Sequence, residues 1–340
     1  MKIRSITLFM NPKWPLDLPA LRKAGFFNQT ARGAFTEAGY EVQTTRLATT
    51  PFPALLGESG LREGALVQLS REIEAVGAEL GMAYIALGPA GADLPESYAA
   101  IPAAVAATQN VFFSGQMSTA DGRLSLAGIR ACAKVIHELA PLTEDGFANL
   151  RFAALANVPA GAPFFPAAYH AGEKPAFALA TQAADLAVTA FSEASSVAEA
   201  RQWLVQAVES HAAALCRVGE ALAAQFKLRF AGIDFSLAPY PKRDCSLGEA
   251  MERLGAPAVG RHGSLAAAAL LAESLDRARF PHVGFSGLML PVLEDAVLAQ
   301  RAAEGTLTVK DMLLYSAVCG TGLDTVPLPG DASVEQLAAL

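Results

Sequence analysis

Residues 1–47 read MKIRSITLFMNPKWPLDLPALRKAGFFNQTARGAFTEAGYEVQTTRL, and this stretch decides the fold. Residues 3–9 have the pattern of a buried strand, and Asn11 and Pro12 end it. A helix follows over about residues 19–37, with Gly39 at the place where glycine commonly ends a helix. Residues 41–47 then predict a second strand. The stretch therefore predicts a strand–helix–strand unit.

The same alternation continues along the chain. Further strands are predicted at residues 83–87, 111–116, 151–158, 176–181 and 230–235, with a glycine-bearing, strand-like stretch at 282–290. Further helices are predicted at residues 61–80, 94–109, 125–140, 196–226, 264–279, 292–303 and 309–318. This order is typical of an α/β protein with a mostly parallel sheet. Because no internal repeat or low-complexity linker interrupts it, we expect a single domain over residues 1–340.

Composition excludes several partners. The 340 residues are 52% hydrophobic and only 17% charged, with a net charge of -7. No run of lysine or arginine stands out, so we expect no nucleic acid and no anionic membrane as partners. The uncharged run at 97–120 contains Pro102, Gln109 and Asn110, which a membrane helix would not favour.

The cysteines indicate the compartment. Cys132, Cys216, Cys245 and Cys319 are scattered and form no C-x-x-C pair. Such usage is typical of free thiols in a reducing cytoplasm. The first ten residues lack the apolar core of a signal peptide, so we expect a cytoplasmic protein.

Residues 317–331, AVCGTGLDTVPLPGD, place a cysteine, flexible glycines and a carboxylate side by side. Glycine lets a backbone turn tightly and approach a ligand. Cys319 is a candidate nucleophile, but it follows a helix, and that end does not lower a thiol pKa. The alternative is a small buried apolar side chain. We therefore expect this loop to close a site, with Cys319 near the reacting centre.

Two aspartates are candidate catalytic carboxylates. Asp234 and Asp324 each follow a glycine-containing turn and have apolar neighbours. A carboxyl group in apolar surroundings can be a base with a raised pKa, or it can be paired with backbone amides as a turn or cap. Both interpretations remain open for each residue.

Tyr169 and His170 end the segment PAGAPFFPAAYH, residues 159–170. Its prolines and phenylalanines predict a stiff apolar loop that could orient a substrate, with His170 as an acid or base. The alternative is a loop that only packs. We expect Asp234, Tyr169, His170 and Asp324 to approach one cavity, because sites gather at strand ends in parallel sheets.

Residues 260–264, GRHGS, predict an anion cradle made of Arg261, His262, free backbone amides and Ser264 as the helix N-cap. The alternative is a plain capped helix start. Ser286, in GFSG at 284–287, resembles part of a nucleophile elbow and is a candidate substrate-binding residue. Leu288 replaces the last glycine of that motif, so no hydrolase triad is predicted. No pattern defines a metal site or a nucleotide cofactor.

Several segments together resemble one family. They are RFAALANVP at 151–159, PFFPAAYH at 163–170, GIDFSLAP at 232–239, GFSG at 284–287, and Cys319 with GLD at 322–324. This combination resembles the domain-of-unknown-function 711 family over nearly the whole chain. The resemblance implies a fold like that of pyruvate formate-lyase and anaerobic ribonucleotide reductase. That fold is a barrel of about ten strands in two halves, with helices outside and a loop through the middle.

The resemblance carries fold rather than activity. A glycyl radical enzyme needs a glycine in a characteristic C-terminal segment, and Gly330 stands instead in LPGD at 328–331. The sequence thus predicts an enzyme without radical chemistry, acting on a small anionic metabolite in the barrel interior. His170 or Asp324 would be its acid–base residue. The alternatives are a non-catalytic ligand-binding or regulatory protein using the same cavity, and an oligomeric structural protein.

Overall fold

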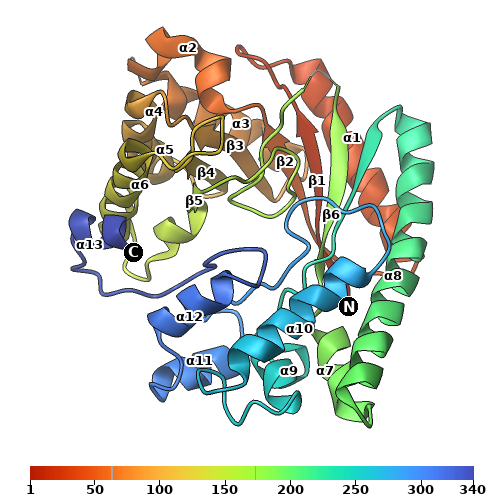
Figure 1. Cartoon of the computed structure of the whole chain (residues 1–340). Helices are drawn as coiled ribbons and strands as arrows, with labels where there is room; N and C mark the ends of the chain where they lie inside the picture. Colours follow the sequence, from red (N-terminus) through yellow and green to blue (C-terminus); the bar gives the residue numbers. More distant parts are fainter. Residues whose placement is uncertain (63, 173) are drawn as a thin grey trace.

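A single seven-stranded sheet organises the molecule (Figure 1). The computed structural model describes residues 1–62, 64–172 and 174–340. The strands lie in the order β5-β4-β3-β2-β1-β6-β7. Their bounds are β1 Lys2–Met10, β2 Val42–Thr49, β3 Tyr84–Ala90, β4 Val111–Gln116, β5 Phe152–Leu155, β6 Ala176–Gln182 and β7 Arg229–Asp234. Neighbouring strands are parallel except for β1 and β6, which confirms the predicted α/β class with a mostly parallel sheet.

Helices connect the strands and continue after the last one. The α-helices are α1 Leu18–Glu37, α2 Phe52–Arg62, α3 Ala65–Glu79, α4 Pro95–Ala99, α5 Ile101–Ala106, α6 Leu126–Leu139, α7 Ala184–Glu193, α8 Val197–Phe226, α9 Leu247–Arg253, α10 Ser264–Arg277, α11 Ala296–Ala303, α12 Val309–Ser316 and α13 Val334–Ala339. Three short 3-10 helices are η1 Ala140–Leu142, η2 Phe147–Arg151 and η3 Arg243–Cys245.

The β1–α1–β2 unit forms as the first 47 residues predict. The Asp17 side chain caps α1 by accepting a hydrogen bond from the Ala20 amide at 3.0 Å. Gly39 follows the end of the helix with φ +90°, a conformation that glycine adopts without strain. The chain then returns as β2, which pairs in parallel with β1.

The two faces of the sheet differ. Ile6 and Leu8 of β1 belong to the main apolar core, to which α1, α3 and α8 also contribute. Ser5, Thr7 and Phe9 alternate with them and point to the opposite face, which we call the inner face. Figure 1 shows α1 and α8 side by side next to the β1–β6 part of the sheet.

The stiff segment at residues 159–170 covers the inner face. The Pro163 carbonyl accepts hydrogen bonds from Thr7 Oγ1 at 3.0 Å and from Ser5 Oγ at 3.5 Å. Ala168 packs in a small buried cluster with Phe9, and both are almost wholly buried. The segment therefore replaces a layer of helices on this side of β1.

The sheet is smaller than the resemblance implies. Within the described residues it has seven strands instead of about ten, and β5 and β7 are its two edges. Closure into a barrel is therefore not shown. The antiparallel β1–β6 pair separates five parallel strands, β5 to β1, from the parallel pair β6 and β7.

Three predicted elements differ from the structure. Residues 94–109 form two short helices, α4 and α5, because Pro102 has no amide hydrogen to continue the first and starts the second instead. Residues 282–290 form no strand beyond one bridge between His282 and Ile233, because Gly284 and Ser286 have positive φ angles. The helix expected from residue 292 begins at Ala296.

One apolar core contains residues from Ile3 to Cys319, and the single domain over 1–340 stays a prediction. No helix in the described part of the chain is long and apolar enough to cross a membrane.

Candidate functional site

The inner face carries polar side chains in two adjacent rows across the sheet. The strand register aligns Thr44, Ser5 and Asp234 in one row, and Arg46 and Thr7 in the next. Charged side chains in a sheet interior are uncommon, because removing them from water is costly. These two rows of polar side chains are therefore the leading candidate for a functional site.

Asp234 ends β7 and is fully buried. Its carboxylate accepts hydrogen bonds from the Phe285 amide at 2.7 Å, the Ser286 amide at 2.8 Å and the Ser236 hydroxyl at 2.6 Å. Burial raises its pKa to about 6, although these hydrogen bonds oppose the rise. Of the two interpretations open from sequence, the geometry matches a carboxylate paired with backbone amides, and its main effect is to hold residues 284–287 against the sheet.

Ser286, the predicted substrate-binding residue, is buried in the same contact. Its hydroxyl accepts a hydrogen bond from the Phe235 amide at 3.2 Å and donates toward the Val283 carbonyl at 3.3 Å. The residue has φ +43°, which is unusual for a residue other than glycine. Its hydroxyl is thus engaged with the backbone in this conformation.

Arg46, on β2, was not predicted as a site residue. Its side chain is only 7% exposed, and it makes no ion pair with any described residue. The guanidinium lies over the rings of Tyr84 and Phe165, 5.4 Å and 5.1 Å from their centroids. Nε donates to Thr44 Oγ1 at 2.8 Å. Burial, helped by the nearby charge of Arg4, lowers its pKa to about 9.

A second charged group lies next to Arg46. Arg4 pairs with Glu294 at 2.5 Å, and Glu294 also acts electrostatically on both Arg46 and Asp324. The carboxyl group of Asp324, a predicted catalytic residue, has a pKa raised to about 6. Burial is the main cause, the charge of Glu294 adds to it, and Arg4 opposes it. The structure thus places Asp324 beside two charged side chains that come from distant parts of the chain.

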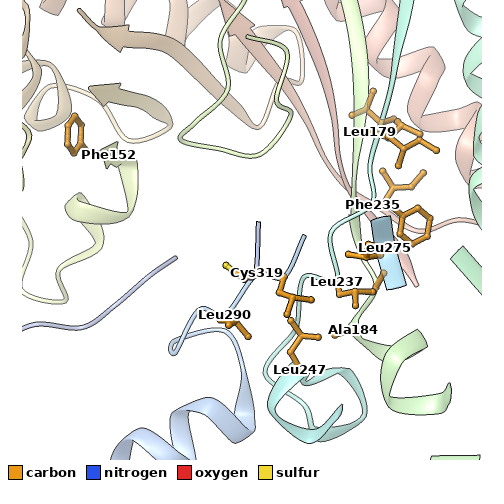
Figure 2. Close-up of a cluster of buried hydrophobic side chains, with 14 of the residues drawn as sticks. Phe152, Leu179, Ala184, Phe235, Leu237, Leu247, Leu275, Leu290 and Cys319 are labelled. Atoms are coloured by element: carbon orange, nitrogen blue, oxygen red, sulfur yellow. The ribbon is translucent and has the colours of Figure 1, made fainter. Parts of the chain in front are cut away.

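Cys319 lies in the main core and has no exposed surface. Figure 2 shows it among the buried apolar side chains of this core, together with Leu237, Leu247 and Leu290. The Thr321 amide donates to its sulfur at 3.4 Å, and its carbonyl accepts from the Leu288 amide at 3.0 Å. In this conformation a substrate cannot reach the thiol, so the environment is that of a core residue.

Tyr169 and His170 lie at the other end of the sheet. The His170 amide donates to Thr49 at the end of β2, whereas Asp234 is aligned with Ser5 near the start of β1. These positions are about 16 Å apart along the strand, at roughly 3.3 Å per residue. The structure therefore does not bring His170 and Asp234 into one cavity.

The two loop residues are held in place rather than exposed. Tyr169 donates its hydroxyl hydrogen to the Val158 carbonyl at 2.8 Å. His170 is 4% exposed, and burial lowers its pKa. Its Nε2 is buried without a hydrogen-bond partner among the described residues. A neutral imidazole at this end of the sheet is thus separate from the charged group around Arg46.

The predicted anion cradle at residues 260–264 needs a correction. The N-cap of α10 is Gly263, and Ser264 is its first residue, with a hydroxyl that donates to the Ala258 carbonyl at 3.3 Å. The Gly260 amide donates to the Tyr315 hydroxyl at 3.1 Å, and the Arg261 amide to Ala258. These turn hydrogen bonds use amides that an anion would need. Arg261 and His262 are exposed, and anion binding there stays a prediction.

One sequence signal would have found Arg46. It is the one charged residue in the buried strand VQTTRLAT. Arg4 has the same signal in β1, but its partner Glu294 is far away in the sequence. No local pattern predicts which distant loop supplies that partner. In the described residues, no three His, Cys, Asp or Glu side chains are close enough together to hold a metal ion.

The fold and the site define an α/β protein with a seven-stranded, mostly parallel sheet and a charged group on one face. The family model described as "Uncharacterised ACR (DUF711)" matches residues 1–340, and the chain belongs to this family. This confirms the resemblance seen in the sequence, while the likeness to pyruvate formate-lyase remains unconfirmed.

Relatives share most of the chain. A "UPF0210 protein" of Desulforudis audaxviator is 31% identical over 336 residues, which cover 94% of this chain and 74% of that protein. A "UPF0210 protein" of Pyrobaculum arsenaticum is 30% identical and aligns with 100% of this chain and 80% of its own length. A UPF0210 protein of Listeria monocytogenes is 27% identical over 90% of this chain and 71% of its own.

Proposed function

We propose that the protein is a cytoplasmic enzyme that acts on a small anionic metabolite at the inner face of the sheet, without glycyl radical chemistry. One observation carries the proposal: the Asp324 carboxyl group lies beside the Arg4–Glu294 ion pair and has a pKa near 6. A carboxyl group with this pKa can hold or release a proton close to neutral pH, as a general acid or base must.

The neighbouring residues would have different roles. Arg4 and Glu294 set the charge around Asp324, and Arg46 offers a positive charge to an anionic substrate. Asp234 positions the loop at 284–287 through its hydrogen bonds to two amides of that loop. Asp324 is therefore our candidate acid–base residue, and Asp234 is a positioning residue.

A non-catalytic ligand-binding or regulatory protein is the second candidate. It is favoured by the engagement of Asp234, Ser286 and Cys319, whose polar atoms are all bonded within the protein. Such a protein would use the same face for binding without turnover. We also propose association into a homodimer or a higher oligomer, which light scattering at micromolar concentration would test.

The likeness to the glycyl radical enzymes rests on one feature. The antiparallel β1–β6 pair joins two groups of parallel strands, and the fold implied by the resemblance also has two halves. The second half has two strands here, where the family resemblance implied five. Closure of the barrel is accordingly a proposal that only this reversal supports.

Turnover tests the enzyme proposal. The protein would be incubated with a metabolite extract, and mass spectrometry would follow the loss of each compound and the appearance of products. We expect the native protein to consume a small anionic compound and Asp324→Asn to do so at least about 100-fold more slowly, the usual contribution of general acid–base catalysis. Asp331→Asn, an exposed aspartate on the same segment, is the matched control and should match the native rate.

The outcomes separate the candidates. Equal turnover by Asp324→Asn and the native protein would show that Asp324 is not the acid–base residue. Binding of an anion without any turnover would favour the ligand-binding protein instead.

A further inference from the structure

We propose that Arg46 is the anchor for the anionic group of the ligand, a carboxylate or a phosphate, which its two terminal amino groups bind. This inference rests on the proposed function and makes it more specific, because it names the residue and the chemical group.

The first observation is an uncompensated buried charge. Arg46 is 7% exposed, and no carboxylate in the described residues lies within ion-pair distance of it. Within the described part of the chain, Nε is its one nitrogen with a hydrogen-bond partner, the hydroxyl of Thr44. A buried cation without a counter-ion destabilises the folded state, so few proteins retain one without a use. The remaining donors match the two oxygens of a carboxylate or phosphate.

The second observation is that the guanidinium is held in place. Tyr84 and Phe165 contact it from β3 and from the covering loop. Stacked rings and the Thr44 hydrogen bond restrict its rotation before any ligand arrives, which lowers the entropy cost of binding. The site is thus assembled from two strands and from the loop at residues 159–170.

Arg151 is a second buried arginine with which Arg46 can be compared, and it is 5% exposed. Its amino groups donate to the carbonyls of Thr108 at 2.7 Å and Val105 at 2.6 Å, at the end of α5. A buried arginine with a structural role thus has backbone acceptors for its terminal amino groups. Arg46 has none among the described residues, which separates the two cases.

The charged groups facing Arg46 also favour an anion. Arg4 on β1 adds a second positive charge, and Glu294 offsets it by pairing with Arg4. Arg4 and Glu294 therefore offset each other, and the positive charge of Arg46 itself is left without a counter-ion among the described residues.

Binding and stability together test the proposal. Inorganic phosphate and succinate, each compared with potassium chloride at equal ionic strength, would be titrated by calorimetry and by urea unfolding. We expect both anions to raise the urea midpoint of the native protein, because a ligand of the folded state stabilises it. A response to phosphate alone identifies a phosphate ligand, and a response to succinate alone identifies a carboxylate ligand.

Arg46→Gln should change both anion binding and stability. It should weaken anion binding by about tenfold or more, the usual effect of losing hydrogen bonds to a charged group. In chloride it should also unfold at a higher urea concentration than the native protein, because it removes an uncompensated buried charge. Arg46→Lys keeps the charge but loses the planar fork, so it should also bind the anion less tightly than the native protein.

Two control variants keep the test decisive. Arg151→Gln should unfold earlier in every solution yet keep the anion response. Arg261→Gln should keep the response too, because its exposed side chain lies in the turn at residues 260–264. The proposal is overturned if Arg46→Gln keeps the response, or if Arg261→Gln alone loses it.

This test is independent of the turnover experiment. Asp324→Asn should still bind the anion, whatever its rate of turnover. If Asp324→Asn loses turnover but Arg46→Gln still binds the anion fully, the proposed role of Arg46 as the anchor is wrong and the proposed enzyme stands. If Arg46→Gln loses anion binding but the native protein shows no turnover, the proposed enzyme activity is wrong and the role of Arg46 as the anchor stands.

Discussion

Gly284 packs directly against the carboxylate of Asp234, and no side chain fits between these two residues. A Cβ on Gly284 would collide with Asp234 Oδ2 and lie 2.9 Å from Pro163 Cδ. Gly284 also has φ +66°, which strains any other residue. We expect Gly284→Ala to lower the free energy of unfolding by about 3 kcal/mol, the sum of backbone strain and overpacking.

Gly305→Ala is the matched control for this change. Gly305 has φ +73°, but its Cβ would meet open space, so only the backbone strain of about 1 kcal/mol remains. Urea unfolding of both variants measures the difference. Equal losses of unfolding free energy in the two variants would show that the loop at residues 284–287 moves away from Asp234 without cost.

The stability of the protein should depend on pH through Asp324. Its pKa is about 6 in the folded state, above the ordinary 3.8, so the folded state binds the proton more tightly than the unfolded chain. The resulting stabilisation is complete below the unfolded pKa and is lost as the pH rises through the folded pKa. Between about pH 4 and pH 6.5, the range set by the unfolded and folded pKa values, we expect the urea midpoint to decrease as the pH rises.

Asp324→Asn should make that decrease smaller but should not abolish it, because Asp234 also has a pKa near 6. Urea unfolding at several pH values provides the measurement. Identical pH profiles for the variant and the native protein would mean that the Asp324 pKa is not raised.

Thiol labelling should separate the cysteines by burial. Cys216 is partly exposed, whereas Cys319 has no exposed surface. Iodoacetamide should therefore modify Cys216 first in the native protein, and Cys319 at the rate at which the turn at 319–322 opens. Peptide mass spectrometry after short labelling times gives the order. Faster labelling of Cys319 than of Cys216 would restore it as a candidate nucleophile.

Asp295 should be among the most sensitive positions for stability. It caps α11 through the Val297 and Leu298 amides, and it also accepts from the Leu247 amide at the start of α9. Asp295→Ala leaves these buried donors unpaired, so we expect a loss of about 3 kcal/mol or more.

Asp17→Ala is the comparison for a single cap, because Asp17 accepts from one amide of α1. It should cost about 1 kcal/mol. Thermal or urea unfolding of both variants tests the ranking. A smaller loss for Asp295→Ala than for Asp17→Ala would contradict the double-cap interpretation.

The sequence predicted the elements that local patterns determine. The β1–α1–β2 unit follows from apolar alternation in the strands and from a glycine at 39 after the helix. It mispredicted residues 282–290, where apolar composition suggested a strand. Positive φ angles at Gly284 and Ser286 turn the chain there, and Asp234 fixes that turn from a distance. Composition alone does not contain this contact.

The candidate site was predicted in part for the same reason. Asp324 was chosen from its apolar neighbours, and its raised pKa arises from burial and from Glu294, which a single sequence does not place nearby. Arg46 was missed although it is the one charged residue of its strand, because only the fold shows that no described residue pairs with it. His170 was expected near Asp234, but the reversal between β1 and β6 puts the two at opposite ends of the sheet.

That reversal also affects how the chain is made. A ribosome releases β1 and β2 early, so β1 can pair on one side long before residues 176–182 exist to pair on the other. Until then a strand that lies inside the finished sheet is an edge, with Ile6, Leu8 and Phe9 among its side chains. Exposed apolar edges promote association between chains. We therefore expect the growing chain to be prone to association until β6 has been translated.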